Sequence, residues 1–164
     1  MFYVRDNYQD RRSMILKFKN EQDICIAIIL AAADFEWTIR RIILSLSQEP
    51  NTVVRKDKRY LRCCSGLGDY KSVWNLLIAK NPKLVNPDNP TDLELQSVIK
   101  AWNSFKQMYK YRHGIVHGFK ANLNFDEGCK ALDSILKATD NIYNFSQANG
   151  YDVFTKVKVV RKPR

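Results

Sequence analysis

The sequence predicts an all-α protein, a helical bundle of about four to five helices with a long first helix and a basic C-terminal tail. Apolar residues recur at spacings of three and four over long stretches, which is typical of one face of a helix. Only 6 glycines and 5 prolines occur among 164 residues, which argues against a loop-rich or all-β chain. The length and the apolar content of 45% predict a single domain over residues 1–164, with its helical core at about 13–149.

The first predicted helix begins near Ser13 and is the longest. Residues 1–12 carry no clear pattern and stay unassigned. Pro50 ends a helix of roughly 25–35 residues, in which a break is expected near Asn20. Its stripe passes through seven apolar positions: Ile24, Ile28, Ala31, Phe35, Ile39, Ile42 and Leu46.

The later helices are predicted from their start signals. Asp69 is expected to cap a helix that runs to about Lys80 and buries Val73, Trp74 and Leu77. Thr91 and Glu94 form a capping-box pattern ahead of a third stripe. That stripe comprises Leu95, Val98, Trp102, Phe105 and Tyr109.

The last predicted helix starts at Asp126 and stops near Gly150. Its expected inner stripe comprises Cys129, Leu132, Leu136, Thr139 and Tyr143. The tail, residues 151–164, alternates apolar and basic residues and is expected to be an extended arm or a short strand.

The charge balance favours polyanionic partners. The chain has 27 Lys+Arg against 17 Asp+Glu, a net charge of +10, which points first to nucleic acid and second to an anionic membrane surface. A basic protein without such a partner is the alternative. The apolar run at 24–33 is too short to cross a bilayer, and the N-terminus lacks the pattern of a signal peptide, so neither membrane insertion nor export is expected.

The cysteines indicate a reducing compartment, which predicts a cytoplasmic protein. Cys63 and Cys64 are adjacent, whereas zinc ligands are usually two to four residues apart so that they converge. Cys25 and Cys129 fall on apolar faces and are expected to be buried thiols. No metal or other cofactor is predicted.

The segment Tyr109-Lys-Tyr-Arg-His-Gly-Ile-Val-His-Gly118 holds both histidines of the chain, His113 and His117. Three positions after Tyr109, Arg112 takes a place on the stripe where an aliphatic residue is expected. A charge there needs a partner or a hydrated cleft, and Asp34 and Glu36 are the candidate supports. A structural salt bridge is the alternative role for Arg112.

These residue types suit RNA cleavage. The reaction needs a base for the ribose 2′-hydroxyl, an acid for the leaving 5′-oxygen, and a cation for the charge on phosphorus. Histidine can serve as acid or base near neutral pH. Arginine offers a planar pair of donors to phosphate.

The segment Arg112-His-Gly-Ile-Val-His117 resembles the R-x4–6-H motif of the HEPN superfamily, and residues 32–43 are similar to the family's first core helix. The resemblance covers roughly residues 20–147. It implies an α-helical bundle and a metal-independent ribonuclease of toxin–antitoxin or antiviral-defence type. His113 stands where the family commonly has a polar residue, often asparagine.

The resemblance also implies a homodimer, in which Arg112 and His117 of both chains form one composite catalytic site and His113 orients Arg112 or binds phosphate. An antitoxin or defence-system protein is a further implied partner. One branch of the family extends the motif to H-x-Y with a modified tyrosine. Phe119 occupies that position here, which argues against this regulation at that residue.

The run at 53–62 is the second basic candidate; it lies within a connector predicted at 50–68 and holds five cationic residues and Tyr60. An RNA-backbone surface and a solvated loop are both compatible with this run. The predicted RNA-binding residues are Arg55, Lys56, Lys58, Arg59 and Arg62. The basic residues of the tail leave the same two possibilities open; they are Lys156, Lys158, Arg161, Lys162 and Arg164.

The expected function is therefore a metal-independent endoribonuclease. The alternative is a non-catalytic helical module that binds RNA, nucleotide or a partner protein, and a third possibility is a structural subunit of a larger assembly.

Overall fold

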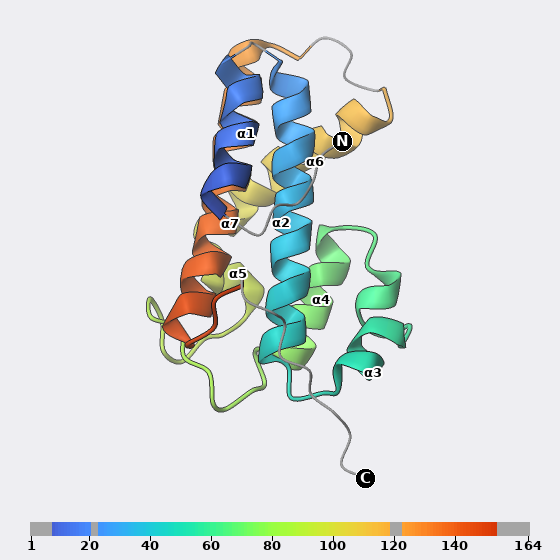
Figure 1. Cartoon of the computed structure of the whole chain (residues 1–164), viewed down its shortest axis with the longest axis vertical. Helices are drawn as coiled ribbons and strands as arrows, with labels where there is room; N and C mark the ends of the chain where they lie inside the picture. The colour runs from blue at the N-terminus through green and yellow to red at the C-terminus, as the bar shows by residue number, and fades with distance from the viewer. Residues whose placement is uncertain (1–7, 21–22, 119–122, 154–164) are drawn as a thin grey trace. The chain divides into compact units, whose positions relative to one another are not determined.

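The computed structural model describes residues 8–20, 23–118 and 123–153, and it confirms the all-α prediction for them. They form seven α-helices and one short 3-10 helix, which exceeds the four to five helices expected. Figure 1 shows their order along the chain. The elements are α1 (Tyr8–Asn20), α2 (Ile24–Leu46), α3 (Asn51–Lys56), η1 (Leu61–Cys63), α4 (Leu67–Leu77), α5 (Leu95–Val98), α6 (Trp102–Val116) and α7 (Phe125–Ala148).

The chain divides into two compact units. The first comprises Met1–Trp37 and Ala101–Asp140, and the second comprises Thr38–Lys100 and Asn141–Arg164. Helices α2 and α7 contribute residues to both units. Among the described residues, no helix is both long enough and apolar enough to span a membrane.

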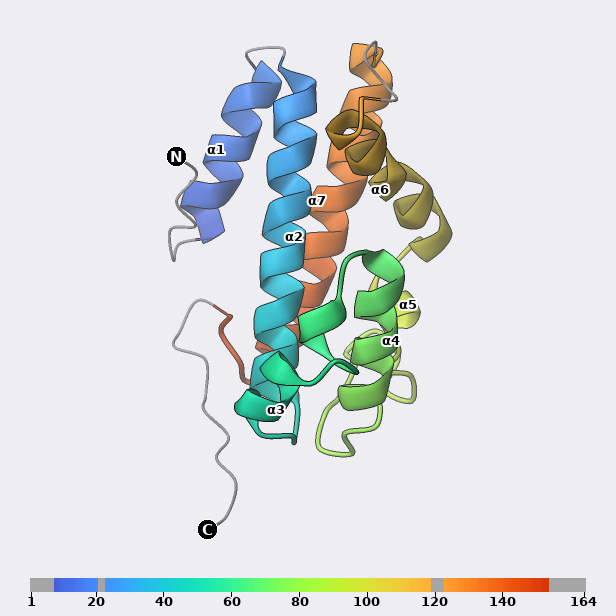
Figure 2. The same cartoon turned by 90° about the vertical axis from the view of Figure 1, so that its right-hand side faces the viewer.

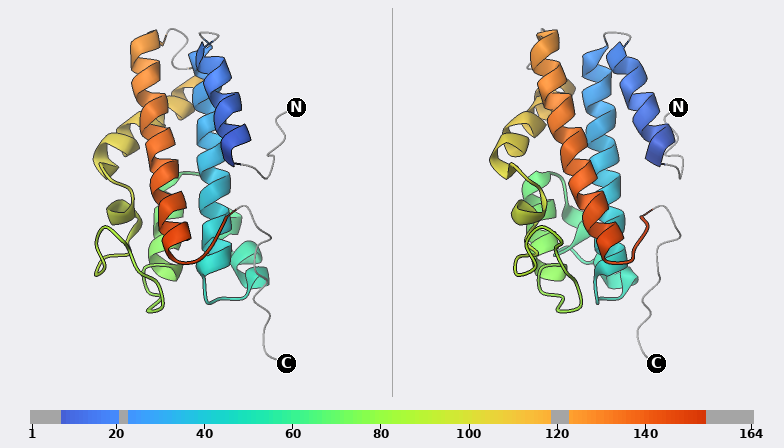
Figure 3. Two further views of the ribbon diagram at one scale, coloured as in Figure 1. Left: turned by 60° about the vertical axis from the view of Figure 1, so that its left-hand side comes forward. Right: turned by 90° about the vertical axis from the view of Figure 1, so that its left-hand side faces the viewer.

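In the first unit, α1 lies beside the N-terminal part of α2 and runs antiparallel to it (Figures 1 and 3). The expected break near Asn20 is confirmed, and α1 extends back to Tyr8, into the stretch that has no clear sequence pattern. The Phe35 ring on α2 packs at a steep angle against the rings of Phe105 and Tyr109 on α6, with ring centroids 5.1 and 5.8 Å apart. Other buried apolar residues of this unit are Ile15, Ile24, Ala27, Ile28, Ala31, Ala32, Ala131, Leu132, Ile135, Leu136 and Ala138.

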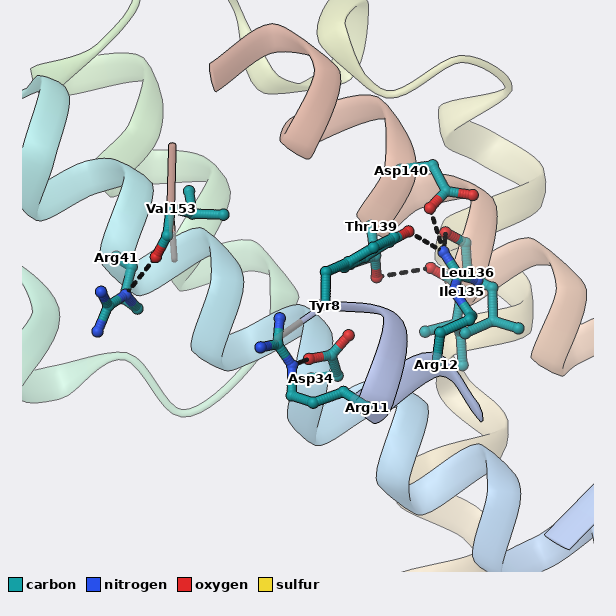
Figure 4. Close-up of polar contacts among 10 residues, drawn as sticks. All are labelled: Tyr8, Arg11, Arg12, Asp34, Arg41, Ile135, Leu136, Thr139, Asp140 and Val153. Atoms are coloured by element: carbon teal, nitrogen blue, oxygen red, sulfur yellow. Dashed lines mark hydrogen bonds and ion pairs between the residues drawn. The ribbon is translucent and has the colours of Figure 1, made fainter. Parts of the chain in front are cut away.

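Two adjacent arginines fasten α1 to its neighbours within the first unit (Figure 4). Arg11 is 2% exposed, donates from Nε to Asp34 on α2, and lies 4.3 Å above the Trp37 ring. Arg12 pairs with Asp140 on α7 and donates to the Leu136 carbonyl at 3.3 Å. A charge as deeply buried as Arg11 is tolerated only because a carboxylate meets it.

In the second unit, α3 and α4 lie beside the C-terminal part of α2 (Figure 2). Trp74 is fully buried, packs against Phe145 with ring centroids 5.3 Å apart, and donates from Nε1 to the Leu93 carbonyl at 2.9 Å. The predicted burial of Val73, Trp74 and Leu77 is confirmed. Helix α3 and η1 form within the stretch that was expected to be a connector.

Two predicted helix starts are wrong, because α4 begins after Gly66 and α5 begins after Glu94, and neither of these N-cap residues makes a side-chain hydrogen bond to its helix. Asp69 is the third residue of α4, not its cap, and it accepts from the N–H groups of Ser65 and Gly66 ahead of the helix. Thr91 donates to Asn89 instead of capping. Asp92 accepts the Glu94 N–H at 3.0 Å, and α5 begins one residue later.

The start of α7 is likewise capped by an unexpected residue. Asn124, not Asp126, supplies the oxygen, which accepts the Asp126 N–H at 2.9 Å. Leu132, Leu136 and Thr139 are buried as expected, whereas Cys129 and Tyr143 are only half-buried. The helix ends at Ala148, and Gly150 has a φ of 71°, in agreement with the predicted stop.

The third predicted helix is divided at Ala101, which precedes α6 and has a φ of 57°. This left-handed conformation brings Cβ close to the following carbonyl oxygen, so it is unfavourable for any residue that has a side chain. The continuous stripe from Leu95 to Tyr109 therefore belongs to two helices, α5 and α6.

We expect Ala101→Gly to raise the free energy of unfolding by about 0.5–1 kcal/mol, because glycine adopts a positive φ without a Cβ clash. Ala33→Gly is the matched control. Ala33 is exposed within α2, so that change should lower the free energy by about 1 kcal/mol. Urea unfolding measures both, and a less stable Ala101→Gly protein would contradict the expectation.

The first part of the C-terminal tail is held against α2 by a hydrogen bond at Val153. Val153 is buried, and its carbonyl accepts from Nε of Arg41 at 2.7 Å (Figure 4). Residues 154–164, and with them the predicted arm or strand and its five basic residues, lie outside the described part of the chain.

Candidate functional site

Arg112, His113 and His117 lie at the C-terminal end of α6, in the first unit. The helix ends at Val116, but the His117 N–H still donates to the His113 carbonyl at 3.0 Å, so helical geometry extends to this histidine. Gly118 follows with a φ of 72°, the left-handed conformation that commonly ends a helix.

Arg112 faces Glu36 on α2. Its Nη2 lies 3.7 Å from Glu36 Oε1, and the same oxygen accepts the Tyr109 hydroxyl at 2.7 Å. Arg112 continues the buried side of α6, where Phe105 and Tyr109 pack, yet its side chain remains 32% exposed. A separation of 3.7 Å is an ion pair but not a direct hydrogen bond, so the guanidinium is oriented by Glu36 without being saturated by it.

Asp34, the other predicted support of Arg112, binds Arg11 instead. Residues two apart on a helix point about 200° apart around its axis, so Asp34 and Glu36 face different neighbours. Burial raises the pKa of Asp34, and the nearby Arg11 opposes this shift. The sequence predicted both carboxylates as supports of Arg112. The orientation of α2 about its own axis directs Glu36 to Arg112 and Asp34 to Arg11.

His113 and His117 form a close pair. Their ring centroids are 4.3 Å apart with an interplanar angle of 49°, and both residues are exposed. The contact follows from their spacing, since residues four apart are neighbours on one face of a helix. His113, whose expected roles were to orient Arg112 or to bind phosphate, packs against His117.

Arg112 and His117 project from different sides of α6. Five helical steps correspond to about 140° around the axis, so the two side chains diverge. Arg112 points toward α2, while His117 belongs to the exposed side. One copy of α6 therefore does not direct both groups at a single phosphate.

Two lysines that were not predicted as site residues extend the histidine face along α6. Lys106 and Lys110 are exposed and share a face with His113 and His117, because the spacings are four, three and four. The structure assigns neither lysine an ion pair with any described residue. The sequence pattern that could have revealed these lysines is the helical spacing of basic residues on the side of α6 opposite its apolar stripe.

The predicted RNA-binding segment lies in the second unit, and all five of its basic residues are exposed. Arg59 is tied to Asp57 by a 2.8 Å ion pair, and its hydrogen bond lowers the pKa of Asp57 to about 2. Tyr60 is only 8% exposed, so the aromatic ring belongs to the core and does not offer the stacking surface that the sequence suggested. The other four cations are Arg55, Lys56, Lys58 and Arg62.

Residues that could hold a metal ion are sparse. Among the described residues, no three His, Cys, Asp or Glu side chains come together as a metal site. Of the cysteines, Cys63 is exposed and Cys64 is half-buried, and burial raises the pKa of the Cys64 thiol to about 11. Phe119, the position of the H-x-Y tyrosine, lies outside the described residues.

Comparison of the chain with protein-family models, with curated proteins and with solved structures finds no match.

Proposed function

We propose that this protein is a metal-independent endoribonuclease of HEPN type that acts as a homodimer, with RNA as its substrate. The observation that carries the proposal is the end of α6, where an arginine held by Glu36 adjoins a pair of exposed histidines. This combination supplies a phosphate-binding cation and proton-transfer groups in one short segment. The resemblance of the same segment to the R-x4–6-H motif supports the assignment.

The reaction assigns one task to each group. His117 acts either as the base that removes the proton of the ribose 2′-hydroxyl or as the acid that protonates the leaving 5′-oxygen, and solvent water exchanges the other proton. The 2′-oxygen forms a new bond to phosphorus as the bond to the 5′-oxygen breaks. The products are a 2′,3′-cyclic phosphate and a 5′-hydroxyl end, and Arg112 stabilises the negative charge that develops on the phosphoryl oxygens.

Dimerisation is part of the proposal because Arg112 and His117 diverge on a single helix. A second copy related by a two-fold axis brings Arg112 of one chain toward His117 of the other. Val116 is 51% exposed beside His117 and is available for an apolar contact across such an axis. A strictly monomeric protein would count against the composite site.

The direct test is cleavage of end-labelled RNA by the purified protein in EDTA. We expect fragments ending in a 2′,3′-cyclic phosphate or its hydrolysis product. Binding without fragments would favour the alternative, a non-catalytic RNA-binding module. If the protein is a toxin or defence effector of the cytoplasm, it also has an antitoxin or an activating protein as a partner. Co-purification from the native host tests for that partner.

Lys106 and Lys110 are expected to bind RNA phosphates along α6. Replacing both with glutamate should weaken RNA binding. The slope of the logarithm of the binding constant against the logarithm of the salt concentration should also become shallower, by the contribution of about two phosphate contacts. Lys130→Glu is the matched control, because Lys130 is equally exposed on α7 of the same unit. Fluorescence anisotropy at several salt concentrations measures the difference, and an equal loss per substituted lysine in the Lys130 control would show that only net charge matters.

A further inference from the structure

We infer that His113 and His117 form a chelating site for Zn²⁺, and that the bound ion inhibits the proposed cleavage reaction. The binding follows from the geometry of α6 alone. The inhibition rests on the proposed function, because it requires that His117 transfer a proton. The two parts are therefore tested separately.

The backbone sets the two imidazoles at a chelating distance. A histidine pair four residues apart on one helical face is the arrangement with which helices bind zinc. The His117 N–H donates to the His113 carbonyl at 3.0 Å, so the helical spacing is maintained up to the second histidine. Ligand nitrogens about 2.0–2.1 Å from one zinc ion lie roughly 3 Å apart, a separation close to the 4.3 Å between the two ring centroids.

The surroundings permit an ion to enter. Both histidines are exposed, so the ion keeps water in its remaining coordination positions. Lys110 lies one turn before His113 and opposes a second positive charge, but it is exposed and can swing into solvent. The C-terminal end of α6 favours cations, because its last carbonyl groups carry the negative end of the helix dipole.

Zinc is the ion that this donor set suits. Neutral imidazole is a good ligand for zinc, copper and nickel, whereas magnesium and calcium prefer oxygen. With two protein ligands the site is exchangeable and weaker than a structural zinc site. Binding occupies one nitrogen of His117 and removes it from proton transfer, so zinc acts on the residue that the reaction needs.

The test is calorimetric titration of the folded protein with Zn²⁺ at neutral pH, with Cys63→Ser in every protein to remove the exposed thiol. We expect one ion per chain, and affinity at least about tenfold lower for His113→Gln, since a ligand is lost. The matched control is Lys110→His combined with His113→Gln. It keeps two histidines on the same face but places them seven residues apart, roughly 10 Å along the axis, too far to chelate.

Retention of wild-type affinity in either variant would overturn the site. For the second part, Zn²⁺ should inhibit RNA cleavage by the unaltered protein, and His113→Gln should need about tenfold more zinc for the same inhibition. Zinc binding with no effect on cleavage would overturn the inhibition alone. Zinc binding by a protein that never cleaves RNA would overturn the proposed function and leave the metal site standing.

Discussion

His117→Ala is expected to abolish RNA cleavage while the protein stays folded. Loss of a general acid or base lowers rates by about 10²–10⁴-fold, and the side chain is exposed, so its removal opens no cavity. The measurement is the initial rate of cleavage of end-labelled RNA in EDTA, beside circular dichroism and thermal unfolding of the same sample. A folded His117→Ala protein with full activity would refute the catalytic role.

Mixing two inactive variants tests the composite site more sharply. Arg112→Ala and His117→Ala chains, combined and allowed to exchange subunits, should recover about a quarter of the wild-type rate. Half of the dimers are then mixed, and each mixed dimer retains one intact pair of Arg112 and His117 from opposite chains. No recovery, despite demonstrated exchange, would mean that both groups act within one chain.

Asp34→Ala is expected to lower the free energy of unfolding by about 3–5 kcal/mol, the largest loss that we predict for a single substitution outside the apolar core. The change leaves the Arg11 guanidinium at 2% exposure without its carboxylate. Urea unfolding measures the loss. The matched control is Lys19→Ala, which removes a far more exposed ion pair with Asp133 and should change stability by less than about 1 kcal/mol.

A double substitution distinguishes the net contribution of the ion pair to stability from the destabilisation caused by removing only one of its partners. Arg11→Met combined with Asp34→Leu removes both charges and keeps similar volumes, so most of the stability lost in Asp34→Ala should return. A double variant as unstable as Asp34→Ala would show that Arg11 matters through its packing on Trp37 and its other contacts. The helical content of each variant, measured by circular dichroism, reports whether α1 remains folded.

The helices themselves were largely predictable, because their apolar spacing is a property of the chain alone. The stripe from Ile24 to Leu46 coincides with α2, and the buried face of α4 at Val73, Trp74 and Leu77 was named correctly. The helix starts were less predictable. Several polar residues near each start can supply a capping oxygen, and at the start of α7 the folded loop selects Asn124 over Asp126. At α5, Asp92 accepts the Glu94 N–H ahead of the helix, and Thr91 takes no part in the cap.

Two features had no local signal. Ala101 adopts a left-handed conformation that alanine by itself disfavours, so its local sequence gave no reason to expect it. Arg11 lies in a polar stretch without a clear apolar stripe, yet it is buried because Asp34 and Trp37 receive it. For Arg11 the compensating interactions come from residues distant in the sequence.

For the candidate site, the sequence by itself determined which groups could do chemistry and that His113 and His117 would be neighbours, since residues four apart on a helix meet without help from the rest of the fold. Tertiary structure alone decided which carboxylate faces Arg112. Glu36 and Asp34 are two residues apart on α2, and the packing of α1 and α6 within the first unit gives Glu36 to Arg112 and Asp34 to Arg11. Such a choice depends on the rotation of α2 against its neighbours, and no local pattern encodes it.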